Sequence, residues 1–201
     1  MLIQIFCKAP IAGQVKTRLT PHLSPTQAMQ LHQQLAWHTF KQVQQTQNNH
    51  IELWCAPTCQ HPFFQKAQKQ FNFKPQTQVG TDLGTRMGYA LQQGLKKHSQ
   101  VLLCGTDCPQ LTADKFQQAR DALKQVDAVL IPATDGGYVL IGLRRYHAEL
   151  FTNITWGSDQ VCQQTIAKLI ALNYSYRCLS PLSDIDRPTD LSLLDKSVFD
   201  I

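Results

Sequence analysis

The stretch LIQIFCKAPIAGQVKTRL, residues 2–19, joins a short apolar run to a basic loop. Its first six residues are almost continuously apolar, which is typical of a strand that is buried on both faces of a sheet. The loop that follows contains Lys8, Gly13, Lys16 and Arg18 and no acidic residue. Open α/β sheets bind ligands beyond the carboxyl ends of their strands, so we expect this loop to bind a small anion.

Similar apolar runs recur along the chain with room for a helix between most of them. They lie at residues 51–55, 101–105, 127–133 and 138–143. The alternation predicts an α/β fold with a mostly parallel sheet, helices on its faces and right-handed crossovers. The last two runs are joined only by TDGG, which is too short for a crossover helix, so we expect a hairpin or an antiparallel edge there, and hence a mixed sheet.

Three helices have recognisable N-terminal signals. The first begins after Ser24, a good N-cap residue, with Pro25 in its first turn. The second is expected to open at Thr112 and the third at Ser158, each with an aspartate close behind. Asn173 is a candidate for the end of the third helix.

Length and composition indicate one globular domain spanning residues 1–201, with 43% hydrophobic residues available for its core. The apolar runs are far shorter than the ~20 residues of a membrane span, and no basic leader precedes the first strand, so we expect a cytoplasmic protein without a membrane span. The net charge of +5 is mild and not clustered with aromatic residues, which argues against nucleic acid as a partner.

The seven cysteines are odd in number and lie within or beside apolar runs. This usage is typical of reduced thiols rather than of a disulfide framework. Two pairs, Cys55 with Cys59 and Cys104 with Cys108, have three-residue gaps, and structural zinc is the less favoured alternative.

The basic loop is the first candidate site. Gly13 would let backbone N–H groups approach a phosphate, and Lys8, Lys16 and Arg18 would supply positive charge. A solvated basic loop without a ligand is the alternative, because the loop is not a Walker A sequence. Residues 79–91 form a glycine-rich entry to a helix, which would place Arg86 near a base or phosphate. A glycine-rich helix entry by itself is weaker evidence for a site than the basic loop.

Two acidic segments are candidates for a divalent cation. Asp107 follows a buried strand, where a carboxylate and substrate phosphates together suit Mg²⁺ or Mn²⁺. The alternative, which the position of Asp107 taken by itself favours, is that it caps the next turn. In SDIDRPTDL, residues 183–191, Asp186 would complete the metal site, or else Asp186 or Thr189 would serve as the N-cap of a short helix.

The hairpin segment is the last candidate. Asp135, Gly136 and Gly137 form a good tight turn, and that interpretation needs no ligand. The two glycines would also let a substrate approach the backbone, with Tyr138 directly after them.

Together these segments resemble one known family. The quoted motifs are FCKAPIAGQVKTRL, GTDCPQLT, DGGYVLIGL and DIDRPTDL, supported by DLGTRM and FTNITWGSDQV. They are similar to those of a bacterial glycosyltransferase-A-like family of candidate nucleotide-diphospho-sugar transferases, also described as a domain of unknown function linked to glycosyltransferases. The resemblance runs from end to end. Ala12 stands where the family usually has proline, and Thr85 stands where it commonly has an acid. These two departures affect the fine geometry of the expected site and not the class of protein.

The resemblance implies a GT-A fold, a three-layer α/β structure with a mixed, mostly parallel sheet that binds a nucleotide over a metal. Lys8, Lys16 and Arg18 would contact phosphates, and Asp107 with the later Asp186 would bind Mg²⁺ or Mn²⁺. Residues 135–138 would line the acceptor side. The implied partners are a nucleotide or nucleotide-sugar and a small-molecule acceptor, and a homodimer stays an open alternative.

Two enzymatic functions compete. In glycosyl transfer from a nucleoside-diphosphate sugar, the metal on Asp107 would neutralise the leaving diphosphate, and Asp135 or Asp159 would act as base. In nucleotidyl transfer, an acceptor would attack the α-phosphate of a nucleoside triphosphate, while Lys16 and Arg18 hold the outer phosphates. The single acid of Thr106-Asp107-Cys108, where many glycosyltransferases of this fold carry D-x-D, favours the second, and the family's name favours the first. A non-catalytic nucleotide-binding sensor is the third reading.

Overall fold

The computed structural model describes residues 1–20, 22–46, 50–195 and 197–200. Within these residues the strands form one seven-stranded sheet of order β3-β2-β1-β4-β6-β5-β7. The strands are β1 (Leu2–Lys8), β2 (His50–Ala56), β3 (Lys74–Thr77), β4 (Val101–Cys104), β5 (Ala128–Pro132), β6 (Tyr138–Leu143) and β7 (Tyr176–Cys178).

The sheet is mixed and mostly parallel, as predicted. β1 pairs in parallel with β2 and β4, and β3 and β7 are parallel edge strands beside β2 and β5. β6 runs antiparallel to both β4 and β5. The predicted hairpin is therefore confirmed, and its reversal brings the start of β6 to the same edge as the carboxyl ends of β1 and β4.

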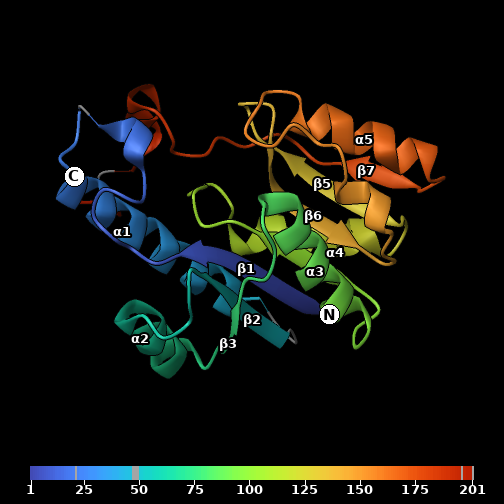
Figure 1. Cartoon of the computed structure of the whole chain (residues 1–201), viewed down its shortest axis with the longest axis horizontal. Helices are drawn as coiled ribbons and strands as arrows, with labels where there is room; N and C mark the ends of the chain where they lie inside the picture. Colours follow the sequence, from blue (N-terminus) through green and yellow to red (C-terminus); the bar gives the residue numbers. More distant parts are fainter. Residues whose placement is uncertain (21, 47–49, 196, 201) are drawn as a thin grey trace.

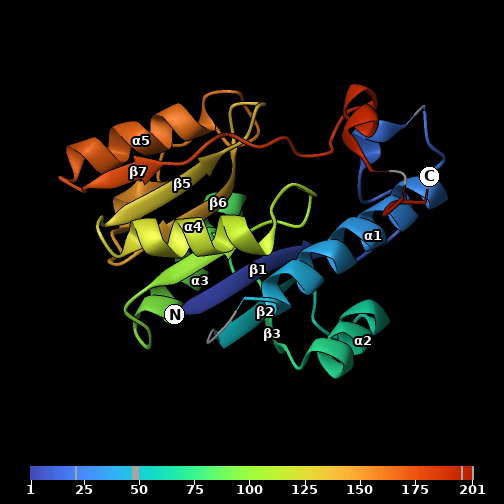
Figure 2. The ribbon, with the colours of Figure 1, turned by 180° about the vertical axis from the view of Figure 1, so that it is seen from behind.

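Helices cover both faces of the sheet (Figures 1 and 2). They are α1 (Pro25–Gln44), α2 (Pro62–Phe71), α3 (Leu83–Leu95), α4 (Ala113–Leu123) and α5 (Val161–Ala171), with short 3₁₀ helices η1 (Thr17–Leu19), η2 (Ala148–Phe151) and η3 (Pro188–Leu193). Along β1, Ile3 and Ile5 pack in the core shared with α1, α2 and α4, whereas Leu2 and Phe6 pack in the core shared with α3 and α5. This alternation gives the three-layer arrangement.

The predicted helix starts hold at two of the three positions. Ser24 forms a capping box with Gln27 ahead of α1, and Thr112 is the N-cap residue of α4. α5 begins at Val161 and not at Ser158, because the Ser158 hydroxyl accepts the backbone N–H of Gln160 and holds the chain in a turn first. Asn173 takes a left-handed conformation, φ 53°, just after this helix ends.

A small satellite core ties the C-terminal segment to the start of α1. It contains Leu19, Leu23, Ala28, Leu31, Leu35, Ile185, Leu194 and Phe199. Figure 1 shows η3, in red, beside η1, in blue. The acidic segment 184–186 is thereby held against the basic loop. Of the helices in the described residues, none is long and apolar enough to span a membrane.

Candidate functional site

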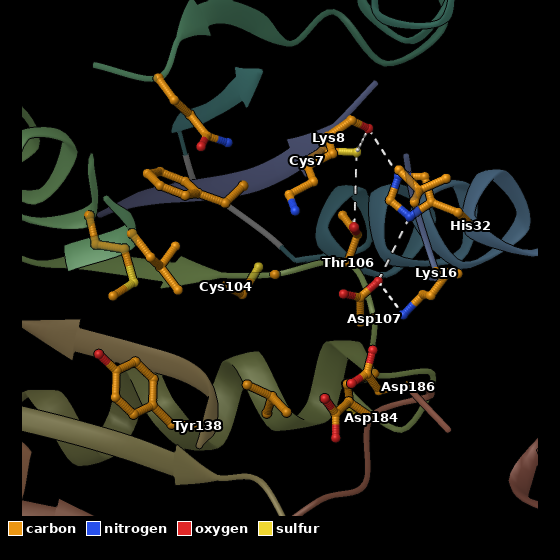
Figure 3. A pocket seen from close by; sticks show the side chains of 18 of the residues that line it. Cys7, Lys8, Lys16, His32, Cys104, Thr106, Asp107, Tyr138, Asp184 and Asp186 are labelled. Carbon is orange, nitrogen blue, oxygen red and sulfur yellow. Dashed lines mark hydrogen bonds and ion pairs between the residues drawn. The ribbon is translucent and has the colours of Figure 1, made fainter. Parts of the chain in front are cut away.

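A cavity of about 540 Å³ opens at the carboxyl ends of β1 and β4. Its lining comes from the end of β1 with its basic loop, the loop after β4, the start of β6 and the acidic segment 184–186, and further residues come from α1, from Gln78 and from the start of α3. Figure 3 shows the charged side chains gathered at one end of this cavity, with Tyr138 away from them. Segments that lie far apart in the sequence thus meet where α/β folds bind ligands.

Lys16 and Asp107 form a close ion pair in this cavity. Lys16 Nζ lies 2.7 Å from Asp107 Oδ1, and the lysine side chain is only 3% exposed. The same ammonium donates to the backbone carbonyl of Ile185. The backbone of Lys16 is left-handed, φ 51°, which costs a non-glycine residue energy and turns its side chain inward. Lys16 is therefore a buried partner of Asp107 rather than a free cation of the loop.

His32 on α1 is a second neighbour of Asp107, and sequence reasoning missed it. The ring is buried, its Nε2 lies 2.9 Å from the Lys8 carbonyl oxygen, and its Nδ1 lies 3.8 Å from Asp107 Oδ1. Since a carbonyl can only accept, Nε2 carries a proton and donates. The only available signal was a histidine within the apolar face of the helix, which is more often a packing residue.

The environment keeps Asp107 ionised. Burial alone would raise the pKa of this carboxyl, but the charge of Lys16 and the contact with His32 outweigh burial and hold the pKa well below its usual range. Oδ1 is buried, yet the side chain as a whole is 48% exposed. The exposed surface therefore lies on the remainder of the carboxylate, which presents a charged oxygen to the cavity. Asp107 does not cap the following turn.

Asp184 and Asp186 flank the buried Ile185 and both line the cavity. Asp186 Oδ2 accepts a 2.6 Å hydrogen bond from Arg18, which is itself half-exposed. Burial and the negative charge of Asp135, with a smaller effect from Asp107, raise the pKa of Asp184 to about 6. Sequence reasoning singled out Asp186 and missed Asp184.

The expected caps of the last short helix were wrong. Arg187, and neither Asp186 nor Thr189, stands at the N-cap of η3. The carboxylate of Asp190 accepts the backbone N–H groups of Asp186 and Arg187, at 3.0 and 2.6 Å.

The other residues predicted to bind phosphate do not all face the main cavity. Lys8 is exposed and lines the main cavity, whereas Gly13 forms a left-handed turn, φ 79°, outside its lining. Arg86 lies in an adjoining hollow of about 320 Å³, which shares Lys8, Gln14 and other lining residues with the main cavity. Its Nε donates to the Gly80 carbonyl at 3.0 Å.

The hairpin turn lies at the rim of the site. Asp135 Oδ1 accepts the Gly137 N–H at 2.9 Å, as in an ordinary Asx turn. A Cβ on Gly136, whose φ is 93°, would lie 2.0 Å from the carbonyl oxygen of Asp159, so packing against the backbone explains this glycine. Tyr138 lines the cavity but buries its hydroxyl, and burial raises the pKa of that hydroxyl. Neither Asp135 nor Asp159 is in the lining of the described cavity.

The cavity suits a divalent cation that arrives with a phosphate. Asp107, Asp184 and Asp186 supply hard oxygen donors, and the repulsion acting on Asp184 is the kind that a cation would relieve. Within the described residues, no three His, Cys, Asp or Glu side chains are arranged as a complete metal site. Mg²⁺ and Mn²⁺ commonly take one or two carboxylates and complete their shell with substrate phosphates and water, which fits this donor set.

Solved structures share this fold. The chain matches a candidate nucleotide-diphospho-sugar transferase from Desulfovibrio desulfuricans G20 with TM-score 0.89 and 28% identity, over 98% of this chain and 86% of that one. A CMP:2-keto-3-deoxy-manno-octonic acid synthetase complexed with CTP matches with TM-score 0.60 and 9% identity, over 96% and 95% of the two chains. Rv0371c from Mycobacterium tuberculosis H37Rv, in complex with manganese, matches with TM-score 0.56 and 15% identity, over 98% and 99%.

The two more distant matches show a common fold alone. None of the curated proteins compared with the chain matches it. The family model described as "Uncharacterized protein conserved in bacteria (DUF2064)" matches residues 39–158, more than half of the chain. With the resemblance to candidate nucleotide-diphospho-sugar transferases confirmed by the Desulfovibrio structure, the chain belongs to this bacterial family, DUF2064.

Proposed function

We propose that this chain is a metal-dependent transferase that uses a nucleoside-diphosphate sugar as its donor. The observation that carries the proposal is the ionised Asp107, which presents an open carboxylate oxygen to a cavity bordered by a basic loop. The Desulfovibrio structure, similar over 98% of this chain, supports the donor class.

In this proposal the loop and the acids have separate tasks. Lys8 and Arg18 bind the donor phosphates, because both are accessible from the cavity. Lys16 and His32 are positioning residues that keep Asp107 ionised and oriented. Asp107, with Asp184 or Asp186, would hold Mg²⁺ or Mn²⁺, which supplies neutralisation of the leaving diphosphate when bound.

The acceptor is assigned to the β5–β6 turn. Tyr138 and Val139 line the cavity wall there. Asp135 is proposed as the base that takes the acceptor's proton, because its negative charge raises the pKa values of Asp184 and Arg18, which line the cavity. Asp159 contributes backbone packing under Gly136 and is the weaker candidate for that role.

Nucleotidyl transfer from a nucleoside triphosphate is the second candidate, and one observation favours it. Thr106 and Cys108, on either side of Asp107, are only 3% and 4% exposed, and neither is acidic, so neither offers a second carboxylate beside Asp107. A site with one central acid beside several cations suits a longer phosphate chain.

A binding panel with Mn²⁺ separates these functions. We would measure thermal shifts with nucleoside-diphosphate sugars and with nucleoside triphosphates on the wild type, on Asp107→Asn and on Asp121→Asn, an exposed acid of α4 that serves as the control. A ligand at a hundred times its Kd adds about 2.7 kcal/mol, a shift of roughly 5 to 10 °C for a chain of this length.

The outcomes discriminate directly. A shift with a diphosphate sugar that needs Mn²⁺ and is lost only in Asp107→Asn supports glycosyl transfer, to be followed by a turnover assay with candidate acceptors. A shift with triphosphates alone supports nucleotidyl transfer. Binding without turnover in either assay identifies a sensor, and no shift with either ligand class refutes the proposal.

A further inference from the structure

We propose that a second hollow, which shares Arg18 with the main cavity, binds an oxyanion of a substrate through Arg187 and His22. The inference rests on the proposed function, because the main cavity would hold the rest of that substrate. This hollow has a volume of about 740 Å³ and is lined by Arg18, His22, Arg187, Pro188 and Thr189. Arg18 lines both cavities, so the two are contiguous through its side chain.

The walls of the hollow are built into the fold. One wall is lined by Arg18 of η1 and by His22, and the other by the start of η3, which lies beside η1 in Figure 1. Leu19 and Leu23 bury their side chains in the satellite core, while His22 between them stays exposed. Ile185 is fully buried in the same core on the opposite wall. The satellite core therefore fixes the separation of the two walls.

The charge of the hollow is positive and in part uncompensated. Arg18 is paired with Asp186. Among the described residues, no carboxylate oxygen forms an ion pair with the exposed guanidinium of Arg187. The nearest acid in sequence, Asp190, already accepts the backbone N–H groups of residues 186 and 187 and the hydroxyl of Thr189.

A planar guanidinium and an imidazole that line the same hollow, with no acid in its described lining, are suited to phosphate or carboxylate oxygens. Two sources of such an anion fit the geometry. It would be the outer phosphates of a nucleoside triphosphate whose α-phosphate lies near Asp107, or an anionic group on the acceptor. Both place the same chemistry on Arg187, and binding experiments separate them.

The first experiment measures pyrophosphate binding by titration calorimetry in buffer without divalent metal. Arg187→Gln is expected to weaken binding at least tenfold. The matched control is Arg177→Gln, which removes the same charge from an exposed position on the edge strand β7 and should stay within twofold of the wild type. Asp107→Asn should bind pyrophosphate as well as the wild type or better, because it removes a negative charge.

The inference is overturned if Arg187→Gln binds pyrophosphate like the wild type, or if the wild type does not bind it at millimolar concentration. It is also overturned if Asp107→Asn alone abolishes binding. Because these measurements need neither metal nor nucleotide, they fail independently of the Mn²⁺ panel that tests the transferase itself.

The second experiment identifies the source. If Arg187→Gln weakens the binding of a nucleoside triphosphate but not that of the corresponding diphosphate, the hollow binds the outer phosphate. The alternative result has two parts. Arg187→Gln binds both nucleotides with wild-type affinity, and the wild-type protein still binds pyrophosphate after it has been saturated with a nucleoside-diphosphate sugar. In that case the hollow binds the acceptor's anion. Either result supports the oxyanion site and names its occupant.

Discussion

Replacing Lys16 by methionine should destabilise the fold far more than an ordinary ion pair would suggest. Methionine keeps the length and apolar stem of lysine but leaves the buried Oδ1 of Asp107 and the carbonyl of Ile185 without their donor. Removing one partner of a fully buried pair costs about 3 to 5 kcal/mol. Asp107 is half-exposed and regains some hydration, so we expect a loss of about 2 to 3 kcal/mol.

The chain contains a matched control for burial. Lys124 and Asp121 form an ion pair with the same 2.7 Å separation, but their side chains are 51% and 52% exposed. Surface pairs contribute about 0 to 1 kcal/mol, so Lys124→Met should change the free energy of unfolding by less than about 1 kcal/mol. Both variants are compared by urea denaturation at pH 7, with the slope of the transition checked for constancy.

A double-mutant cycle completes the test. Asp107→Asn in the Lys16→Met background should cost less than in the wild type, because Asp107 has then already lost its main counter-charge, and the coupling energy should exceed about 1 kcal/mol. If Lys16→Met proves no more destabilising than Lys124→Met, or if the coupling is near zero, then the ion pair does not hold the site together. The roles given to Lys16 and Asp107 would fail with it.

Two further substitutions test the surroundings of the site by urea denaturation. Gly136→Ala should lower the free energy of unfolding by about 2 to 4 kcal/mol, because the alanine Cβ would lie 2.0 Å from the carbonyl oxygen of Asp159 and the backbone φ is positive. A loss below about 0.5 kcal/mol would contradict that packing. Asp127→Asn tests how the stability of the fold depends on pH. Burial alone would raise the pKa of Asp127. The N–H and hydroxyl groups of Ser175 and the guanidinium of Arg145 outweigh burial and lower this pKa. That stabilisation is complete above the unfolded pKa near 4 and disappears as pH falls through the lower folded value. The variant should therefore lose about 1 to 2 kcal/mol at pH 7, and this loss should shrink as the pH is lowered below about 4; a difference independent of pH would contradict the assignment.

The sequence predicted the parts of the fold whose signals are local. Continuous apolar runs identified β1, β4 and β6, and TDGG identified the antiparallel reversal, because burial and turn chemistry act over a few residues. β3 and β7 were not predicted. Their sequences, KPQT and YRC, are short and polar because they are edge strands, and their pairing depends on neighbours distant in the chain.

In the site, too, features with a local sequence signal were predictable, and features that depend on residues distant in the chain were not. The strand end at Asp107 was predictable, because a buried run stops there. The burial of Lys16 was not, since it depends on a left-handed backbone angle and on an acid 91 positions later. The spacing D-I-D was the one available signal for Asp184, because residues two apart in an extended chain share a side, and both aspartates do line the cavity.

The structure also separates two cations that the sequence could not distinguish. Lys16 lines the cavity with only 3% of its side chain exposed and is already paired with Asp107, whereas Arg18 is 56% exposed. A phosphate that binds Arg18 competes with Asp186, and the released carboxylate becomes available to a cation. By linkage, phosphate and cation must then strengthen each other's binding by equal factors. Calorimetry with a nucleoside diphosphate, with and without Mn²⁺, should show tighter binding with the metal, and Arg18→Gln should reduce that gain. An equal gain in Arg18→Gln would show that the Arg18 to Asp186 pair takes no part in the coupling.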